Sequence, residues 1–344
     1  MYTDKELDDA VNNGIFSADS VSAFRNNSNL SRRFVADEER FSLIAGFSDV
    51  FVAISCALLL ASIFLGSLGA LAKAGLIVIC LTALVLSEYF VRVRRMALPA
   101  IVLSLAFVGG VFQLFSFLLA DSLYQVIISS SASAVAAYLY WVRFRVPIVV
   151  AAGVDLVVMF VLAMAELLTV NSLYGYRTHF LALVMFLSGV ASFAFAMILD
   201  ASDRLRATYR SDVAFWLHLL SAPLIVYPIV DSLGVLDTIH GPFSTPLVGE
   251  VRMYVMIFIL FLYLALIILS IVIDRRAFII SSLFYVLIAL GDLMQLSGDS
   301  NGGIFLSGII IGLALLFISA FWTVVRAKIM GFSPLWISCH VPPL

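Results

Sequence analysis

The sequence predicts an all-α protein, a polytopic transmembrane helical bundle with about ten spans. Hydrophobic residues make up 63% of the chain and charged residues only 12%, with a mean hydropathy of +1.11. Soluble domains are roughly half apolar and a quarter charged. Apolar runs recur that are long enough to cross a hydrocarbon core of about 30 Å, which takes roughly 20 helical residues. Lysine and arginine, in turn, gather between alternate runs. These three observations define the fold class.

The apolar runs are separated by short polar segments, and together they predict a transmembrane domain of residues 43–330. The seventh run contains two prolines, and the ninth is short and ends in a glycine-rich polar stretch. A cytoplasmic tail, residues 331–344, follows. The ten predicted spans cover residues 43–65, 71–91, 97–119, 123–142, 147–167, 179–199, 213–232, 252–273, 277–295 and 304–325.

The basic residues predict the orientation of these spans. Residues 1–42 are polar and lack the apolar core and cleavage site of a signal peptide, so the first span is expected to act as its own insertion signal. If the N-terminus is cytoplasmic, seventeen of the 20 lysines and arginines fall on the cytoplasmic side, and only Lys73, Arg177 and Arg252 fall outside. Basic residues are retained on that side. We therefore expect both termini to be cytoplasmic.

Residues 1–42 are expected to form a cytoplasmic helical arm of two short helices. Thr3 and Glu6 are spaced as a capping box, Gly14 ends or bends the first helix, and Ser17 is placed to cap the second. The arm is too small for a core of its own, so its apolar stripe is expected to dock on the membrane domain or on a protein partner. Its first half is acidic, which opposes nucleic-acid binding.

An internal repeat is suggested by the triplet Ser-Asp-Val, which opens an apolar run at residues 48–50 and again at residues 211–213. Similarly spaced arginine pairs follow each triplet, so spans 1–4 and 7–10 read as parallel units. Loop arginines required by the topology would mimic part of this signal. The repeat places Asp49 and Asp212 at the cytoplasmic mouths of two helices. The alternative role is helix capping with pairing to loop arginines such as Arg210.

The fifth span carries an acidic track. Asp155 lies about 12 Å of helix from Pro147, close to mid-membrane, and Glu166 falls on the same helical face eleven residues later. A carboxylate at that depth is a functional hypothesis by default, as a proton or cation site. The alternative is a protonated Asp155 that donates a hydrogen bond to a neighbouring helix, for example to the serines of residues 129–133.

Three further polar residues lie within predicted spans. His218 is the one histidine in the interior of a span, and an imidazole with an ordinary pKa near 6.5 responds to physiological pH. Its alternative role is a neutral hydrogen-bonding core residue. Asp292 and Gln295 share a helical face at the end of the ninth span and suit a cation or a polar solute. An ordinary helix terminus explains them equally well.

Catalytic and metal-binding patterns are missing from the sequence. It contains no H-E-x-x-H, no G-x-x-x-x-G-K-[ST] and no G-x-S-x-G. The three cysteines, Cys56, Cys80 and Cys339, give neither a disulfide framework nor paired metal spacing. We therefore expect no enzyme activity, no metal and no cofactor.

Two stretches carry a resemblance to a known family. The arm is followed by "E-R-F-S-L-I-A-G-F-S-D-V-F-V", and the second span ends in "L-S-E-Y-F-V-R-V-R-R". This pattern, over about the first hundred residues, resembles a family of bacterial polytopic inner-membrane proteins of unknown function. The resemblance implies a multi-pass protein of the bacterial inner membrane, and it brings no functional residues with it.

Two functions remain open from the sequence. The first is a transporter or permease-like protein for a small solute or an ion, with a polar pathway that includes Asp155, Glu166, His218, Asp292 and Gln295. The second is a membrane scaffold or sensor that transports nothing and recruits a protein partner through residues 1–42. The bilayer is the common partner in both cases, and a lipid ligand is compatible with either.

Overall fold

A computed structural model shows helices and turns in the residues that it describes, and no strand among them. The chain divides into two compact units, residues 1–41 and residues 42–344. The described residues are 10–24, 47–66, 72–120, 122–169, 176–203, 208–232, 250–275, 279, 283, 308–309, 312–313, 316–317 and 320–332.

The first unit shows the two local signals predicted for the arm. Gly14 adopts a φ of +70°, and its N–H bonds the carbonyl of Val11 at 3.0 Å, which ends the first helical turn. The Ser17 hydroxyl accepts the N–H of Ser20 at 3.1 Å and so caps the second helix, as predicted. The predicted capping box at Thr3 and Glu6 lies outside the described residues.

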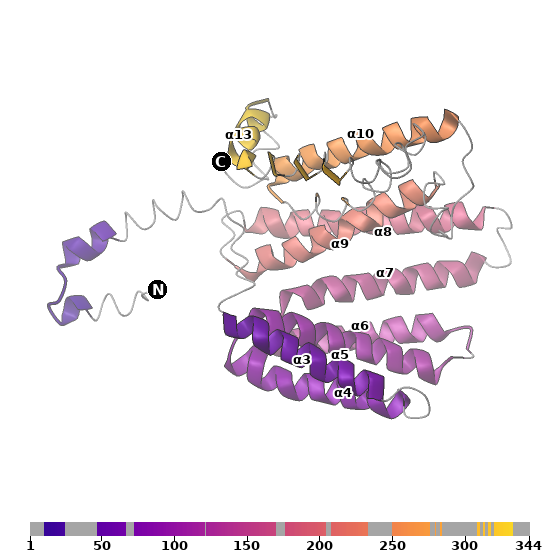
Figure 1. The fold of residues 1–344 in the computed structure, drawn as a ribbon, viewed down its shortest axis with the longest axis horizontal. Coiled ribbons are helices and arrows are strands. Elements are labelled where there is room, and N and C mark those ends of the chain that lie inside the picture. The colour runs from indigo at the N-terminus through magenta and orange to yellow at the C-terminus, as the bar shows by residue number, and fades with distance from the viewer. Residues whose placement is uncertain are drawn as a thin grey trace. The chain divides into compact units, whose positions relative to one another are not determined.

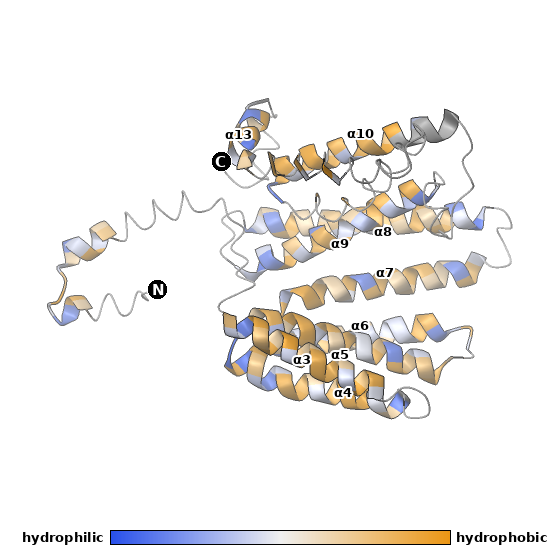
Figure 2. Ribbon diagram, viewed as in Figure 1, coloured by the Kyte–Doolittle hydropathy of each residue, from blue (hydrophilic) through white to orange (hydrophobic). Residues whose placement is uncertain are grey.

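In the second unit, apolar helices run side by side along roughly one common direction (Figure 1). Figure 2 shows them mainly hydrophobic along their length, with hydrophilic residues mostly near their ends. The helix α4 continues directly into a π-helical turn, η1. The elements are α3 (Phe47–Gly66), α4 (Ala72–Ser87), η1 (Glu88–Val93), α5 (Ala97–Leu118), α6 (Gln125–Phe144), α7 (Pro147–Thr169), α8 (Arg177–Ser202), α9 (Tyr209–Ser232), α10 (Glu250–Ile273) and α13 (Trp322–Phe332).

Seven helices in the described residues are long and apolar enough to cross a membrane, and they coincide with the first seven predicted spans. They indicate a multi-pass membrane protein, because so many long apolar helices need lipid as their solvent. The eighth predicted span corresponds to α10. The ninth and most of the tenth fall outside the described residues, so the count of ten spans, the orientation and the internal repeat stay predictions.

Three apolar clusters hold the first seven long helices together. One joins α3, α4 and α5 around Leu103; a second joins α5, α6 and α7 around Tyr140; a third joins α7, α8 and α9 around Leu217. Hydroxyls are satisfied between helices: Ser87 and Tyr140 share a hydrogen bond of 2.8 Å, and Ser133 donates to the carbonyl of Val108 at 2.6 Å. These buried groups therefore keep their partners without water.

The α8–α9 pair makes the closest backbone approach seen at any described glycine. A Cβ on Gly189 would lie 2.8 Å from the backbone carbon of Leu224 and 2.9 Å from the nitrogen of Ile225. Small residues at a helix interface allow such contact in a membrane, where dispersion replaces the hydrophobic effect between helices. Gly189 thus fixes α8 against α9 and sets the frame in which their polar side chains meet.

Candidate functional site

Four polar side chains from three helical elements meet inside the second unit, and we call them the ion-pair centre: Asp200, Ser211, His218 and Arg275. Asp200 lies in the last turn of α8, Ser211 in the first turn of α9 and Arg275 just after α10. His218 lies seven residues beyond Ser211, about 10 Å deeper along α9. All four are at most 4% exposed.

The carboxylate of Asp200 is the hub of this centre. Nε2 of His218 lies 3.0 Å from Oδ2, and Arg275 donates from Nε to Oδ2 at 3.1 Å and from Nη2 to Oδ1 at 2.5 Å. An ionised carboxylate only accepts hydrogen bonds, so the imidazole is the donor at Nε2. The two parallel bonds from Arg275 form the fork geometry that is specific to arginine.

Arg275 also ties the start of α9 to the centre. Its Nη2 donates to the hydroxyl oxygen of Ser211 at 2.8 Å and to the Ser211 carbonyl at 3.2 Å. Backbone carbonyls in the first turn of a helix usually accept a hydrogen bond within that helix. The Ser211 carbonyl therefore accepts the Arg275 bond on its second lone pair. One guanidinium therefore links α10 to both α8 and α9.

The backbone around Arg275 is held in place by its neighbours. Asp274 adopts a left-handed conformation with a φ of 60°, which ends α10 and turns the chain, and the N–H of Arg275 bonds the carbonyl of Ser270 at 2.9 Å. The Ser270 hydroxyl in turn bonds the carbonyl of Arg275. Trp322 of α13 donates from Nε1 to Asp274 at 2.8 Å. The turn that presents Arg275 is therefore anchored on both sides.

The burial of these charges makes the centre costly unless it stays complete. Two ions lose their hydration when buried, and their attraction offsets that loss only when hydrogen bonds satisfy the remaining donors and acceptors. Asp200 meets this condition through His218 and Arg275. Apolar residues at these four positions would fill the same space without the cost of burying charge. The presence of charged residues there makes the centre a candidate for function.

Of the residues predicted for the polar pathway, His218 belongs to the ion-pair centre. Asp155 lies on α7 and is half-buried, and among the described residues none forms a hydrogen bond or ion pair with it. The serines of residues 129–133 do not bind it. Their hydroxyls donate to backbone carbonyls instead, as Ser130 does to Val126 at 2.7 Å.

The other predicted site residues are distributed along the helices. Glu166, near the end of α7, forms an ion pair with Arg177 at the start of α8. Asp49 and Asp212 lie in the first turns of α3 and α9, where a carboxylate complements the helix dipole. Asp292 and Gln295 lie outside the described residues.

Glu88 forms the helical salt bridge to Arg92 that its spacing predicts, with Nη1 and Oε2 3.2 Å apart. It also accepts a hydrogen bond of 2.8 Å from Arg143 at the end of α6. Both pairs are about half exposed, in contrast to the buried ion-pair centre. Glu88 is therefore a surface counterpart to which Asp200 can be compared.

Sequence reasoning missed Asp200 and Arg275, and it noted Ser211 only as part of the Ser-Asp-Val triplet. The predicted sixth span ends at residue 199, one residue before Asp200, whereas α8 continues to Ser202. Arg275 reads as a loop charge that marks topology, yet it is 2% exposed. An intramembrane histidine has to find a polar partner, and that requirement on His218 is the signal that points to a carboxylate such as Asp200.

No family model, no curated protein and no solved structure matches the chain. Among the described residues, no three His, Cys, Asp or Glu side chains gather closely enough to hold a metal ion. The function therefore has to be inferred from the chemistry of the residues themselves.

Proposed function

We propose that the chain is a transporter or permease-like protein of the bacterial inner membrane that moves a small solute or an ion, with both termini in the cytoplasm. The observation that carries the proposal is the buried Asp200–His218–Arg275 arrangement inside apolar helices. Ionisable groups are rare in membrane spans because they are expensive there, and they commonly mark ion pathways and proton relays.

The arrangement can couple ion binding to helix movement, because the one carboxylate of Asp200 accepts hydrogen bonds from both Arg275 and His218. A proton or a metal cation that binds Asp200 weakens its attraction for Arg275, which is the described residue that links the end of α10 to α8 and α9. The end of α10 is then free to separate from the α8–α9 pair. Ion binding at Asp200 would then shift the equilibrium between two positions of α10, which is the kind of coupling that alternating access requires.

Asp155 and Glu166 extend the proposed pathway along α7, which packs against both α8 and α9. Asp155 supplies a half-buried carboxylate in the middle of the helix, and Glu166 supplies one near its far end, where Arg177 neutralises it. Asp292 and Gln295 remain proposed members from the sequence pattern.

Ion flux into vesicles tests this proposal. The full chain is reconstituted in phospholipid vesicles with entrapped fluorescent indicators for H⁺, Na⁺ and K⁺, and a gradient of each ion is imposed in turn. We expect ion flux above that of protein-free vesicles, an at least tenfold loss in Asp200→Asn, and a comparable loss in His218→Asn. Glu88→Gln is the matched control, because it removes a carboxylate from a half-exposed arginine pair.

Two results would overturn the proposal. One is a wild-type protein whose flux equals that of empty vesicles for all three ions. The other is a folded Asp200→Asn variant that transports as fast as the Glu88→Gln control.

A scaffold or sensor is the second candidate, and the arm favours it. Ile15, Phe16 and Phe24 are 68%, 52% and 53% exposed, whereas Val21 is buried. Phe24 lies on the second short helix, and Ile15 and Phe16 lie in the bend before it. Exposed apolar side chains of this kind are typical of a protein-binding surface. In this case Phe16→Ser with Phe24→Ser abolishes capture of one defined protein in a cell-based cross-linking assay, while the purified wild-type chain moves no ion. Flux in the wild type together with normal flux in the double variant would reject this candidate.

A further inference from the structure

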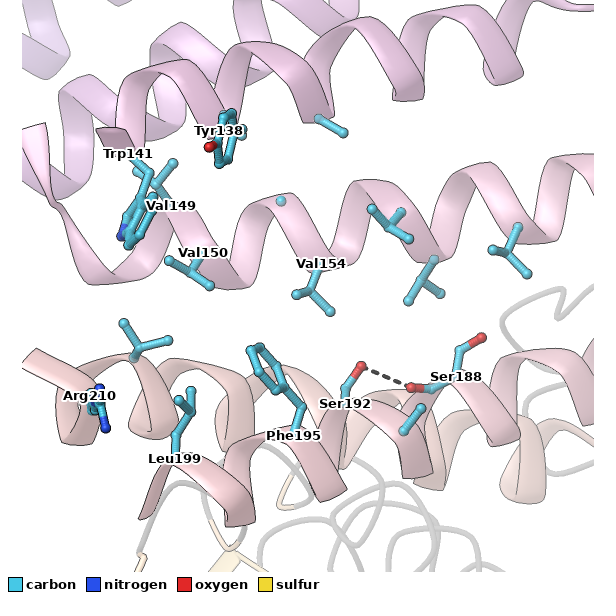
Figure 3. A pocket seen from close by; sticks show the side chains of 18 of the residues that line it. Tyr138, Trp141, Val149, Val150, Val154, Ser188, Ser192, Phe195, Leu199 and Arg210 are labelled. Atoms are coloured by element: carbon cyan, nitrogen blue, oxygen red, sulfur yellow. Dashed lines mark hydrogen bonds between the residues drawn. The ribbon is translucent and has the colours of Figure 1, made fainter. Parts of the chain in front are cut away.

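An apolar groove of about 690 Å³ runs between α6, α7 and α8, on the membrane-spanning part of the chain. Its volume lies within the range of about 300–1,000 Å³ that is usual for small-molecule sites. Figure 3 shows Val150 and Val154 of α7 facing Phe195 and Ser192 of α8 across this space. The groove is therefore a hollow in a surface that lipid tails surround.

The two serine hydroxyls along the groove are already satisfied. The hydroxyl of Ser188 donates to the carbonyl of Val184 at 2.8 Å, and that of Ser192 donates to the carbonyl of Ser188 at 2.8 Å. Both serines thus present a mainly apolar wall. On this wall a polar solute would find no free serine hydroxyl, whereas a hydrocarbon chain would lie against apolar side chains.

One end of the groove is different, because it carries the charge. Arg210 and Tyr209 line this end together with Trp141, and the guanidinium of Arg145 lies 4.6 Å from the centre of the Trp141 ring. The Arg210 side chain is exposed, and the described residues place no carboxylate within 4.0 Å of it. Arginine beside tryptophan and tyrosine is the usual composition of a membrane–water interface.

The length of the groove matches one leaflet. Its wall on α7 runs from Val149 to Val161, about 18 Å of helix. Half of a hydrocarbon core is about 15 Å thick. A ligand with its charge at Arg210 therefore has its apolar part in the same leaflet as the bilayer lipids around it.

We propose that this groove binds an anionic glycerophospholipid, with the phosphate on Arg210 and an acyl chain along the valines of α7. Positive charge at one end only, an apolar wall and a single-leaflet length describe an amphiphile of this class. Arginine is suited to the phosphate because its planar fork gives two parallel hydrogen bonds. The proposal concerns a bound bilayer lipid, and it stands whether or not the ion-pair centre transports ions.

Spin-labelled lipids test this proposal. The full chain is placed in phosphatidylcholine vesicles that contain a trace of spin-labelled phosphatidylglycerol or phosphatidylcholine, and the immobilised fraction is measured by electron paramagnetic resonance. We expect the wild type to prefer phosphatidylglycerol about tenfold. Arg210→Gln removes that preference and leaves phosphatidylcholine binding unchanged. Lys328→Gln, an exposed cation outside the groove, keeps the preference.

A second variant tests the acyl-chain part. Val154→Trp fills the groove and is expected to abolish the immobilised component for both lipids. Ile198→Trp adds the same ring to an exposed position of α8 that does not line the groove, and it retains the component. Inorganic phosphate is expected not to displace the lipid, because it lacks the acyl chain.

Three results would overturn the proposal. The first is an unchanged preference for phosphatidylglycerol in Arg210→Gln. This variant should fold normally, because no described carboxylate pairs with Arg210. The second is displacement of the lipid by inorganic phosphate alone, which would make the site an anion site. The third is a wild-type dimer that becomes a monomer in Val154→Trp, which would assign the groove to a second copy of the chain.

Discussion

Asp200 and Arg275 are separated by 75 residues in the chain and form a two-point contact in the structure. The contact is buried on both sides, at 3% exposure for each side chain. Its loss would leave a charge in apolar surroundings, whereas loss of an exposed pair leaves a hydrated one. The two kinds of pair should therefore differ sharply in their effect on stability.

Removal of the buried guanidinium tests this difference. Arg275→Gln is expected to lower the free energy of unfolding by about 3–5 kcal/mol, the usual result of breaking a buried pair from one side. Arg177→Gln, which breaks the more exposed pair with Glu166, should cost less than about 1 kcal/mol. Unfolding in mixed micelles, followed by circular dichroism, measures both. Equal losses in the two variants would show that burial contributes nothing to the Asp200–Arg275 pair.

Asp155 permits a second prediction at this scale. It is half-buried in mid-helix with no hydrogen bond to a described residue, and a carboxylate there needs water if it has no protein partner. With Cys56, Cys80 and Cys339 replaced by alanine, Asp155→Cys should react with a small membrane-impermeant thiol reagent. Val157→Cys, which lines the apolar groove, should not. If Asp155→Cys does not react in a folded protein, Asp155 is not part of the proposed pathway.

At the scale of elements, glycine decides which helices approach most closely. The adjacent glycines Gly109 and Gly110 of α5 differ in this respect: a Cβ on Gly110 would lie 2.9 Å from the sulfur of Cys80, whereas a Cβ on Gly109 meets no atom within 4 Å. Gly189 is more tightly enclosed, and by backbone atoms that cannot rotate away. Sequence alone does not distinguish these glycines, because helix rotation is set by packing.

An alanine at Gly189 should therefore destabilise the fold. The added methyl group has to push α8 and α9 apart, which costs about 1–3 kcal/mol in a packed interface. Gly109→Ala is the control, and it should be neutral or slightly stabilising because alanine is the better helix former by up to about 1 kcal/mol. Thermal unfolding of the two variants in detergent measures the difference. A Gly189→Ala variant as stable as Gly109→Ala would contradict the observed approach.

At the scale of the whole molecule, the distribution of basic residues makes a prediction about orientation. If the chain has ten spans, the side that holds seventeen of the 20 basic residues is expected to be the cytoplasm and to hold both termini. Reporter domains that are active on only one side of the membrane, fused to each terminus, measure this. Termini on opposite sides would mean an odd number of spans and would reject the ten-span count and the parallel repeat together.

The sequence was sufficient for much of the fold and for little of the site. Apolar length predicts a span because the bilayer has a fixed thickness, and the first seven predicted spans match helices such as α7 within a few residues. His218 was predicted as functional because histidine is costly in lipid. Its partner was not predicted, because pairing between α8, α9 and the end of α10 depends on tertiary packing that helical periodicity does not contain.

The separation of Arg275 from its partners along the chain has a consequence for biogenesis. Asp200, His218 and the Gly189 contact all belong to α8 and α9, which are neighbours in synthesis, so this helical hairpin is complete before α10 leaves the ribosome. During that interval Asp200 has His218 but not its guanidinium. The arrival of residue 275 then closes the centre, and a nascent chain interrupted before that residue would carry an incompletely compensated carboxylate into the bilayer. A chain that ends before Arg275 should therefore be recognised by quality-control proteases, whereas a chain that includes it should not.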